Sequence, residues 1–136
     1  MSAQVSQTDP AIYMVEADPT VRRRADAALA GLPWPIHHFE SPRELLDSLS
    51  YDAHGCVVAN VALVEMTVQE LLQELGREQH KLAIILLSNN IGVAEAVAAM
   101  RAGVHDVLPL PVVERALRRQ VRLAMSDLRT NLKASR

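Results

Sequence analysis

The feature that most constrains this chain is the regular alternation of short apolar runs with segments of helical character. A helical segment follows each of five runs, which cover residues 11–15, 36–39, 55–60, 82–87 and 106–108. The run at 82–87 has no alternating polar residues, as is typical of a central parallel strand covered on both faces. Strands that alternate with helices form parallel βαβ units with right-handed crossovers. The sequence therefore predicts an α/β fold with a doubly wound parallel sheet.

The helical segments carry signals that define where they begin and end. Asp18 precedes Pro19, which suits an N-cap followed by proline at the first helical position, and Gly31 suits the helix end. Residues 41–44 and 67–70 each match a capping box, in which a hydroxyl residue and a glutamate three positions later bond each other's backbone amides. These signals predict helices that begin near residues 19, 42 and 68.

Length and composition predict a single soluble domain. With 136 residues, 49% of them hydrophobic, the chain is an ordinary globular protein. We expect residues 1–10 to be disordered, residues 11–127 to form the domain, and residues 128–136 to form a helical linker or tail toward an output domain. No apolar run approaches the roughly 20 residues that span a bilayer, and the polar start has no signal-peptide core. Together with the single Cys56, this predicts a cytoplasmic protein without membrane association.

Polar residues follow several of the predicted strands. In doubly wound sheets the ligand crevice lies beyond the carboxyl ends of the strands. This rule directs attention to residues 16–18, Asn60, residues 87–89 and residues 109–111. The functional site is therefore predicted at this edge of the sheet.

Two segments resemble a known family. Residues 96–111 look like the signature AVxAMxAGAxDFLxKP, and residues 55–72 look like the segment GCVVxD…MxGxELL. Both signatures are typical of the receiver domain of two-component response regulators, the CheY-like domain, and the chain most closely resembles its FixJ-like type. The resemblance covers residues 11–127 and implies a flavodoxin-like (βα)5 sheet with strand order 2-1-3-4-5.

The resemblance also implies a set of functional groups. Two acids after the first strand hold Mg²⁺, and an Asp ending the third strand accepts a phosphoryl group. A Ser or Thr ends the fourth strand, a Lys-Pro pair follows the fifth, and an aromatic on the fifth strand acts as a switch. By this resemblance, Glu16 and Ala17 stand at the two acidic positions, and Asn60 stands at the phosphoacceptor position. Ser88 keeps the hydroxyl, and Leu110 and Pro111 stand at the Lys-Pro pair. Val107 stands at the position of the switch aromatic.

These departures change the chemistry of the site. An amide at Asn60 has no anionic oxygen to act as the nucleophile. A lysine in a pocket that lacks two carboxylates would be a poorly compensated charge, and Leu110 removes it. We therefore expect a neutral, degenerate pocket that is not phosphorylated on a carboxylate and requires no cofactor.

A metal ion is not expected at this pocket. Glu16 and Asp18 are two residues apart and could offer a weak Mg²⁺ site. The favoured interpretation is that Asp18 caps a helix and that Glu16 is hydrogen-bonded or solvated nearby. We predict no other metal site and no enzymatic activity, because the sequence has no zinc-protease motif, phosphate-binding loop or Ser-His-Asp spacing.

The last helix is the remaining functional signal. Residues 112–136 carry seven basic and two acidic side chains, although the whole chain has a net charge of −2. Apolar residues recur at three- and four-residue steps, a pattern that packs a helix on a sheet or forms a coiled seam. We assign this stripe to an interaction surface made of Val113, Leu117, Val121, Ala124 and Leu128.

The sequence predicts a phosphorylation-independent receiver module that acts through protein contacts. By resemblance, the partner or second copy docks on the fourth helix, fifth strand and fifth helix. A sensor kinase is a further candidate partner, and DNA would be bound only through an output domain. Two alternatives stay open: phosphorylation at Ser88, and a small ligand in the neutral pocket between Glu16, Asn60, Ser88 and Leu110.

Overall fold

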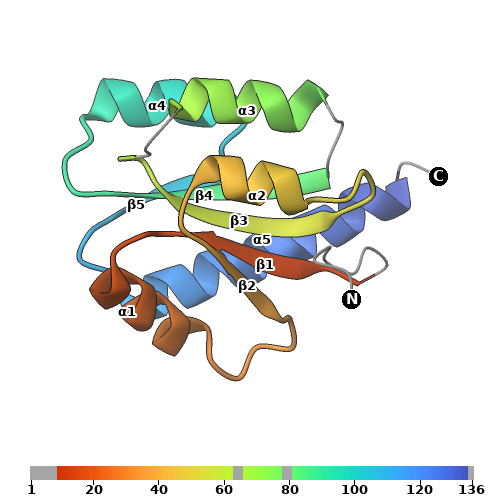
Figure 1. Cartoon of the computed structure of the whole chain (residues 1–136), viewed down its shortest axis with the longest axis horizontal. Helices are drawn as coiled ribbons and strands as arrows, with labels where there is room; N and C mark the ends of the chain where they lie inside the picture. The colour runs from red at the N-terminus through yellow and green to blue at the C-terminus, as the bar shows by residue number, and fades with distance from the viewer. Residues whose placement is uncertain (1–8, 63–65, 78–80, 135–136) are drawn as a thin grey trace.

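The protein folds into one five-stranded parallel sheet between two layers of helices (Figure 1). The computed structural model describes residues 9–62, 66–77 and 81–134. The strand order is β2-β1-β3-β4-β5, with all four pairings parallel, as predicted. The strands are β1 (Ala11–Val15), β2 (Ile36–Phe39), β3 (His54–Asn60), β4 (Lys81–Ser88) and β5 (Asp106–Pro109).

Five helices connect and follow these strands. Their bounds are α1 (Pro19–Leu29), α2 (Pro42–Ser48), α3 (Val68–Arg77), α4 (Val93–Arg101) and α5 (Glu114–Ala134). Figure 1 shows α2, α3 and α4 on one side of the sheet and α1 and α5 on the other. This arrangement is the flavodoxin-like architecture that the resemblance implied.

Each face of the sheet has its own hydrophobic core. Tyr13 and Val57 point to the core under α2 and α3, whereas Ile12 and Cys56 point to the core under α1 and α5. Successive residues of a strand point to opposite faces, so both faces need apolar residues. The absence of polar alternation in the central strands thus has the structural cause that was predicted.

The predicted caps are present. The Asp18 carboxylate accepts the Thr20 amide at 2.8 Å, and Ser41 Oγ accepts the Glu44 amide at 3.1 Å. The 67–70 capping box is reciprocal, with distances of 3.1 Å and 2.8 Å. The 41–44 box differs, because the glutamate accepts the amide of residue 40 in place of that of Ser41. Gly31 follows the end of α1 with φ +86°, a conformation that glycine adopts readily.

The stripe on α5 requires a correction. Leu117, Val121 and Ala124 are fully buried in the core between α5 and the sheet. They cannot form an interaction surface, and the prediction was wrong for these three residues. Val113 is exposed and Leu128 is half-buried. Of the two interpretations of the stripe, packing on the sheet is the one that the structure supports.

The structure describes the two ends of the chain to different extents. Residues 1–8 of the segment predicted to be disordered lie outside the described residues, as do residues 135–136. Helix α5 is 21 residues long and reaches Ala134. Its role as a linker stays a prediction. Within the described residues, none of the helices has the length and hydrophobicity to cross a membrane.

Gly55 at the start of β3 leaves no room for a side chain, because an added Cβ would meet the backbone of the paired strand. Its φ is +142°, and a Cβ there would lie 1.9 Å from the carbonyl oxygen of Ala11 on the paired strand β1. That oxygen belongs to backbone in the centre of the sheet, so it cannot move away cheaply. Gly76 in α3 offers the opposite case, because no atom lies within 4 Å of an added Cβ.

We expect Gly55→Ala to lower the free energy of unfolding by about 2–4 kcal/mol, because strand pairing must shift. The matched variant Gly76→Ala should leave stability unchanged or raise it by up to about 1 kcal/mol through helix propensity. Urea unfolding followed by circular dichroism measures both. Equal stability of the two variants would contradict the close packing of β3 on β1.

Candidate functional site

The carboxyl ends of the strands bring most of the predicted site residues together. Glu16 follows β1, and Asn60 ends the neighbouring strand β3. Ser88 ends β4, and its carbonyl oxygen accepts the Leu110 amide at 2.8 Å. The rule that ligand crevices lie at strand ends therefore located a cluster whose members come from four different strand–helix junctions.

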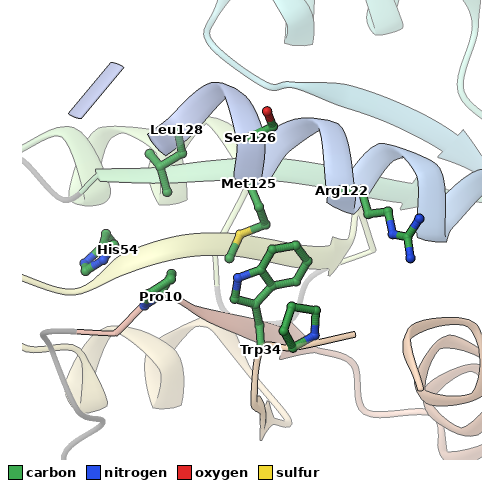
Figure 2. A pocket seen from close by; sticks show the side chains of 8 residues that line it. Pro10, Trp34, His54, Arg122, Met125, Ser126 and Leu128 are labelled. Carbon is green, nitrogen blue, oxygen red and sulfur yellow. The ribbon is translucent and has the colours of Figure 1, made fainter. Parts of the chain in front are cut away.

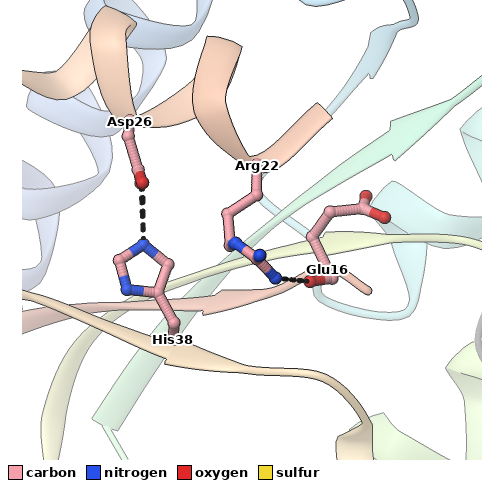
Figure 3. Close-up of polar contacts among 4 residues, drawn as sticks. All are labelled: Glu16, Arg22, Asp26 and His38. Atoms are coloured by element: carbon pink, nitrogen blue, oxygen red, sulfur yellow. Dashed lines mark hydrogen bonds and ion pairs between the residues drawn. The ribbon is translucent and has the colours of Figure 1, made fainter. Parts of the chain in front are cut away.

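Glu16 is a buried carboxylate at the centre of this cluster. It is only 6% exposed, and its two oxygens accept one hydrogen bond each. One comes from Asn60 Nδ2 and the other from the Asp18 amide, both at 3.0 Å. Arg22 donates to the backbone carbonyl of Glu16 at 3.3 Å, and Figure 3 shows the carboxylate pointing away from that guanidinium. The charge is thus compensated by neutral donors, not by an ion pair.

Both the nitrogen and the oxygen of the Asn60 side-chain amide form hydrogen bonds. Its nitrogen donates to Glu16, and its oxygen accepts the Ala62 amide at 2.9 Å. An amide has both donors and an acceptor, so these two bonds fix its orientation. A carboxylate at this position could accept from Ala62 but could not donate to Glu16. The arrangement therefore depends on an amide.

The two residues after Glu16 do not complete a metal site with it. Ala17 offers only a methyl group, and the Asp18 carboxylate caps α1. Both Glu16 oxygens already accept hydrogen bonds from the protein. In the ranges that the structure describes, no three His, Cys, Asp or Glu side chains converge on a common point. The residues present do not fit the hexacoordinate oxygen shell that Mg²⁺ requires.

The other predicted positions are occupied by buried or apolar groups. Ser88 is 3% exposed, and its Oγ accepts the Asn90 amide at 3.2 Å. Leu110 packs against the core under α1 and α5. Val107 packs against the opposite core, under α2, α3 and α4. Val107 and Leu110, which by resemblance stand at the switch and lysine positions, therefore contact different faces of the sheet.

Several titratable groups were not assigned a role from the sequence. His37 and His38 are adjacent on β2 and point to opposite faces of the sheet. The His37 ring centroid lies 5.9 Å from that of Tyr13, and His38 Nε2 lies 2.8 Å from the Asp26 carboxylate (Figure 3). Burial lowers the pKa of His37, and the nearby His38 lowers it further. No local sequence pattern indicates the Asp26 partner on α1.

Cys56 and Tyr13 are buried in the central strands. Burial raises the pKa of the Cys56 thiol to about 12, so the thiolate is suppressed, in keeping with a packing role. The pKa of Tyr13 is raised by burial and, to a lesser extent, by the charge of Asp52. The Tyr13 hydroxyl is buried without a hydrogen-bond partner among the described residues.

Replacing Glu16 tests the network directly. In Glu16→Gln the new NH₂ group must face either the Asn60 amide nitrogen or the Asp18 N–H, which are both donors. We expect the free energy of unfolding to fall by about 1–3 kcal/mol, because a buried donor loses its partner. The control Glu40→Gln, at an exposed site, should change it by less than about 0.5 kcal/mol. Urea denaturation that shows the same stability for both variants would contradict this network.

Comparisons with known proteins agree with the geometry. The family model described as "Response regulator receiver domain" matches residues 12–122. The response regulator protein TodT of Pseudomonas putida is 28% identical over 117 residues, which cover 84% of this chain and 50% of TodT. The transcriptional regulatory protein TdiR of Thauera aromatica is 27% identical over 126 residues, which cover 93% of this chain and 56% of TdiR. The chain thus spans about half the length of these curated relatives.

Solved structures show the same fold. Full-length FixJ from B. japonicum superposes with a TM-score of 0.78 at 26% identity, covering 93% of this chain and 62% of that chain. The signal receiver domain of a LuxO repressor protein from Vibrio parahaemolyticus has a TM-score of 0.81 at 17% identity, covering 92% and 96%. The second likeness shows the fold alone. Because the family model covers most of the chain, this protein belongs to the response regulator receiver domain family.

Proposed function

We propose that this receiver domain signals through protein contacts without phosphorylation of a carboxylate. The observation that carries the proposal is the hydrogen bond from Asn60 Nδ2 to the buried Glu16 carboxylate. By resemblance, Asn60 occupies the phosphoacceptor position, and a carboxylate is the nucleophile that forms an acyl phosphate. An amide cannot supply that nucleophile. Receiver domains are signalling domains, so no enzymatic activity is part of the proposal.

The network also replaces the electrostatic role of a metal. Glu16 has two neutral donors, which stabilise its charge at a buried position. No cation is needed to hold the strand ends together. Leu110 suits this site because it contributes packing and adds no charge beside the single buried carboxylate.

The two alternatives from the sequence are less well supported. Ser88 is almost fully buried, and its Oγ accepts a backbone amide, so a kinase could reach it only after local unfolding. A ligand between Glu16 and Asn60 would have to break the 3.0 Å bond that joins them. Both routes begin with the loss of native hydrogen bonds, which is costly for buried groups.

The proposed docking surface is the exposed apolar part of α4 together with Val113, which directly precedes α5. Helix α4 has no fully buried residue. Its Val93, Val97 and Met100 are 83%, 42% and 47% exposed, and Val113 before α5 is 56% exposed. Large exposed apolar groups that gather on one helix indicate a protein contact. We propose that a second copy of the domain docks here, with another protein partner as the alternative.

Transcriptional output belongs to a wider proposal. TdiR is named a transcriptional regulatory protein, and this chain corresponds to about half of it. We propose that the domain regulates transcription through an output domain, which alone would contact DNA. A sensor kinase stays a candidate partner, bound as a protein and not as a phosphoryl donor.

Nuclear magnetic resonance with Mg²⁺ and then beryllofluoride, which mimics a phosphoryl group on aspartate, tests the site. We expect the amide signals of Asn60, Ser88 and β5 not to shift, because the carboxylate nucleophile and the metal ligands are missing. Saturable shifts that extend to Val107 and α5 would contradict the proposal. Acetyl phosphate treatment followed by mass spectrometry gives an independent readout, with no added phosphoryl group expected.

The variant Asn60→Asp provides the matched comparison. It places a second carboxylate about 3.0 Å from Glu16, and we expect the free energy of unfolding at neutral pH to fall by roughly 1–3 kcal/mol. Repulsion between the two carboxylates raises their pKa in the folded variant above the value in the unfolded chain. The folded variant then binds more protons than the unfolded chain, so its loss of stability relative to the wild type should become smaller as the pH is lowered. Mg²⁺ should stabilise this variant and leave the wild type unchanged. An equal response of both proteins to Mg²⁺ would show that Asn60 does not determine metal binding.

Charge substitutions test the docking surface. We expect Val97→Glu and Met100→Glu each to weaken self-association about tenfold or more, because a charge must be desolvated in an apolar contact. Tyr51→Glu is the control, since Tyr51 is 82% exposed but lies between α2 and β3. Sedimentation equilibrium over a dilution series measures all three. A strict monomer at every concentration would contradict the homodimer.

A further inference from the structure

A second hollow lies at the other edge of the sheet, where the strands begin. It is a pocket of about 550 Å³ between α5 and the segments that lead into β1, β2 and β3 (Figure 2). This volume falls within the range of small-molecule sites in proteins. The pocket is lined by Pro10, Pro33, Trp34, His54, Arg122, Met125, Ser126 and Leu128.

The centre of the pocket is lined by apolar side chains. Figure 2 shows the Trp34 indole facing Met125 of α5, with Pro10 and Leu128 on the side toward His54. An indole face and a thioether both form favourable contacts with a planar aromatic ring. Within the described part of the chain, the Trp34 indole nitrogen has no protein partner, and it is not sealed from solvent.

The charge of the pocket is positive on one side. Arg122 is exposed, lies across Trp34 from His54 in Figure 2, and contacts no carboxylate of the described residues. Among the described residues that line the pocket, there is no Asp or Glu. Arg118, one turn earlier, differs because its guanidinium donates to the carbonyls of Ala28 and Ala30 at 3.1 Å and 2.7 Å. Arg118 thus fixes α5 against the end of α1, and Arg122 remains available.

We propose that this pocket binds a planar aromatic carboxylate, with its ring against Trp34 and Met125 and its carboxylate on Arg122. A guanidinium matches a carboxylate through two parallel hydrogen bonds, and an aromatic ring suits the apolar floor. A neighbouring hollow of about 440 Å³ shares Trp34 but is lined by Asp9, which disfavours an anion there. The ligand would join the second half of α5 to the α1–β2 connection. The proposal does not rest on the chemistry of Asn60.

Heteronuclear magnetic resonance of the full 136-residue chain tests this site with 2-naphthoate as the probe. Trp34 is the only tryptophan, so its indole N–H gives a single reporter signal. We expect 2-naphthoate to shift that signal saturably, and to bind about tenfold or more tightly than the uncharged 2-naphthylmethanol. Arg122→Gln should weaken 2-naphthoate binding about tenfold and leave 2-naphthylmethanol binding unchanged.

Arg115→Gln is the matched control, because it removes the same charge from an exposed position of the same helix outside this pocket. Its affinity for 2-naphthoate should equal that of the wild type. Equal affinities for the two probes, or equal losses in the two arginine variants, would overturn the carboxylate assignment. No shift of the Trp34 signal at about 1 mM probe, or shifts confined to other surfaces, would overturn the site itself.

Discussion

The central strands of the sheet have no solvent-facing side, and this burial determines where polar chemistry can occur. Every residue of β1 is buried, as are the five internal residues of β3. Each face supports a separate apolar core, with α1 and α5 over one and α2 and α3 over the other. Polar side chains with a role in binding are therefore confined to the two edges where the strands begin and end. Both sites described above lie at such edges.

At the carboxyl edge, burial imposes a requirement on Glu16. It directly follows a buried strand, so its carboxylate is removed from water and needs hydrogen-bond donors. Asn60 from β3 and the backbone of Asp18 supply them. The bond from Asn60 also connects the ends of the neighbouring strands β1 and β3. In this structure the cluster therefore links two strand ends through a buried carboxylate and an amide.

At the amino edge, α5 combines packing with exposed charge. One stripe of the helix is buried on the sheet, and Arg118 is fixed by carbonyls at the end of α1. Arg122, one turn later, is exposed at the border of the Trp34 pocket. Helix α4 has no fully buried residue, whereas α2 and α3 on the same side of the sheet bury Leu45 and Leu71. The proposed docking surface thus lies on a helix that buries little of its own surface against the sheet.

The order of elements and the caps could be predicted from the residues, because they depend on local chemistry, such as the capping residues at 18 and 67–70, and on the alternation that forms βαβ units. The strand order followed from the resemblance to the receiver family. The sequence also placed Asn60 near Glu16, because carboxyl ends of parallel strands meet at one edge. It failed for Leu117, Val121 and Ala124, since an apolar period is the same whether a helix packs on its own sheet or on a partner.

Which side chains meet in space became clear from the folded structure alone. Glu16 takes its side-chain donor from Asn60, 44 positions away, and not from the nearby Arg22, which bonds the backbone. The Trp34 pocket gathers residues from the starts of three strands and from α5. No local pattern marks such a site, because its shape depends on the distances between segments that are far apart in the chain.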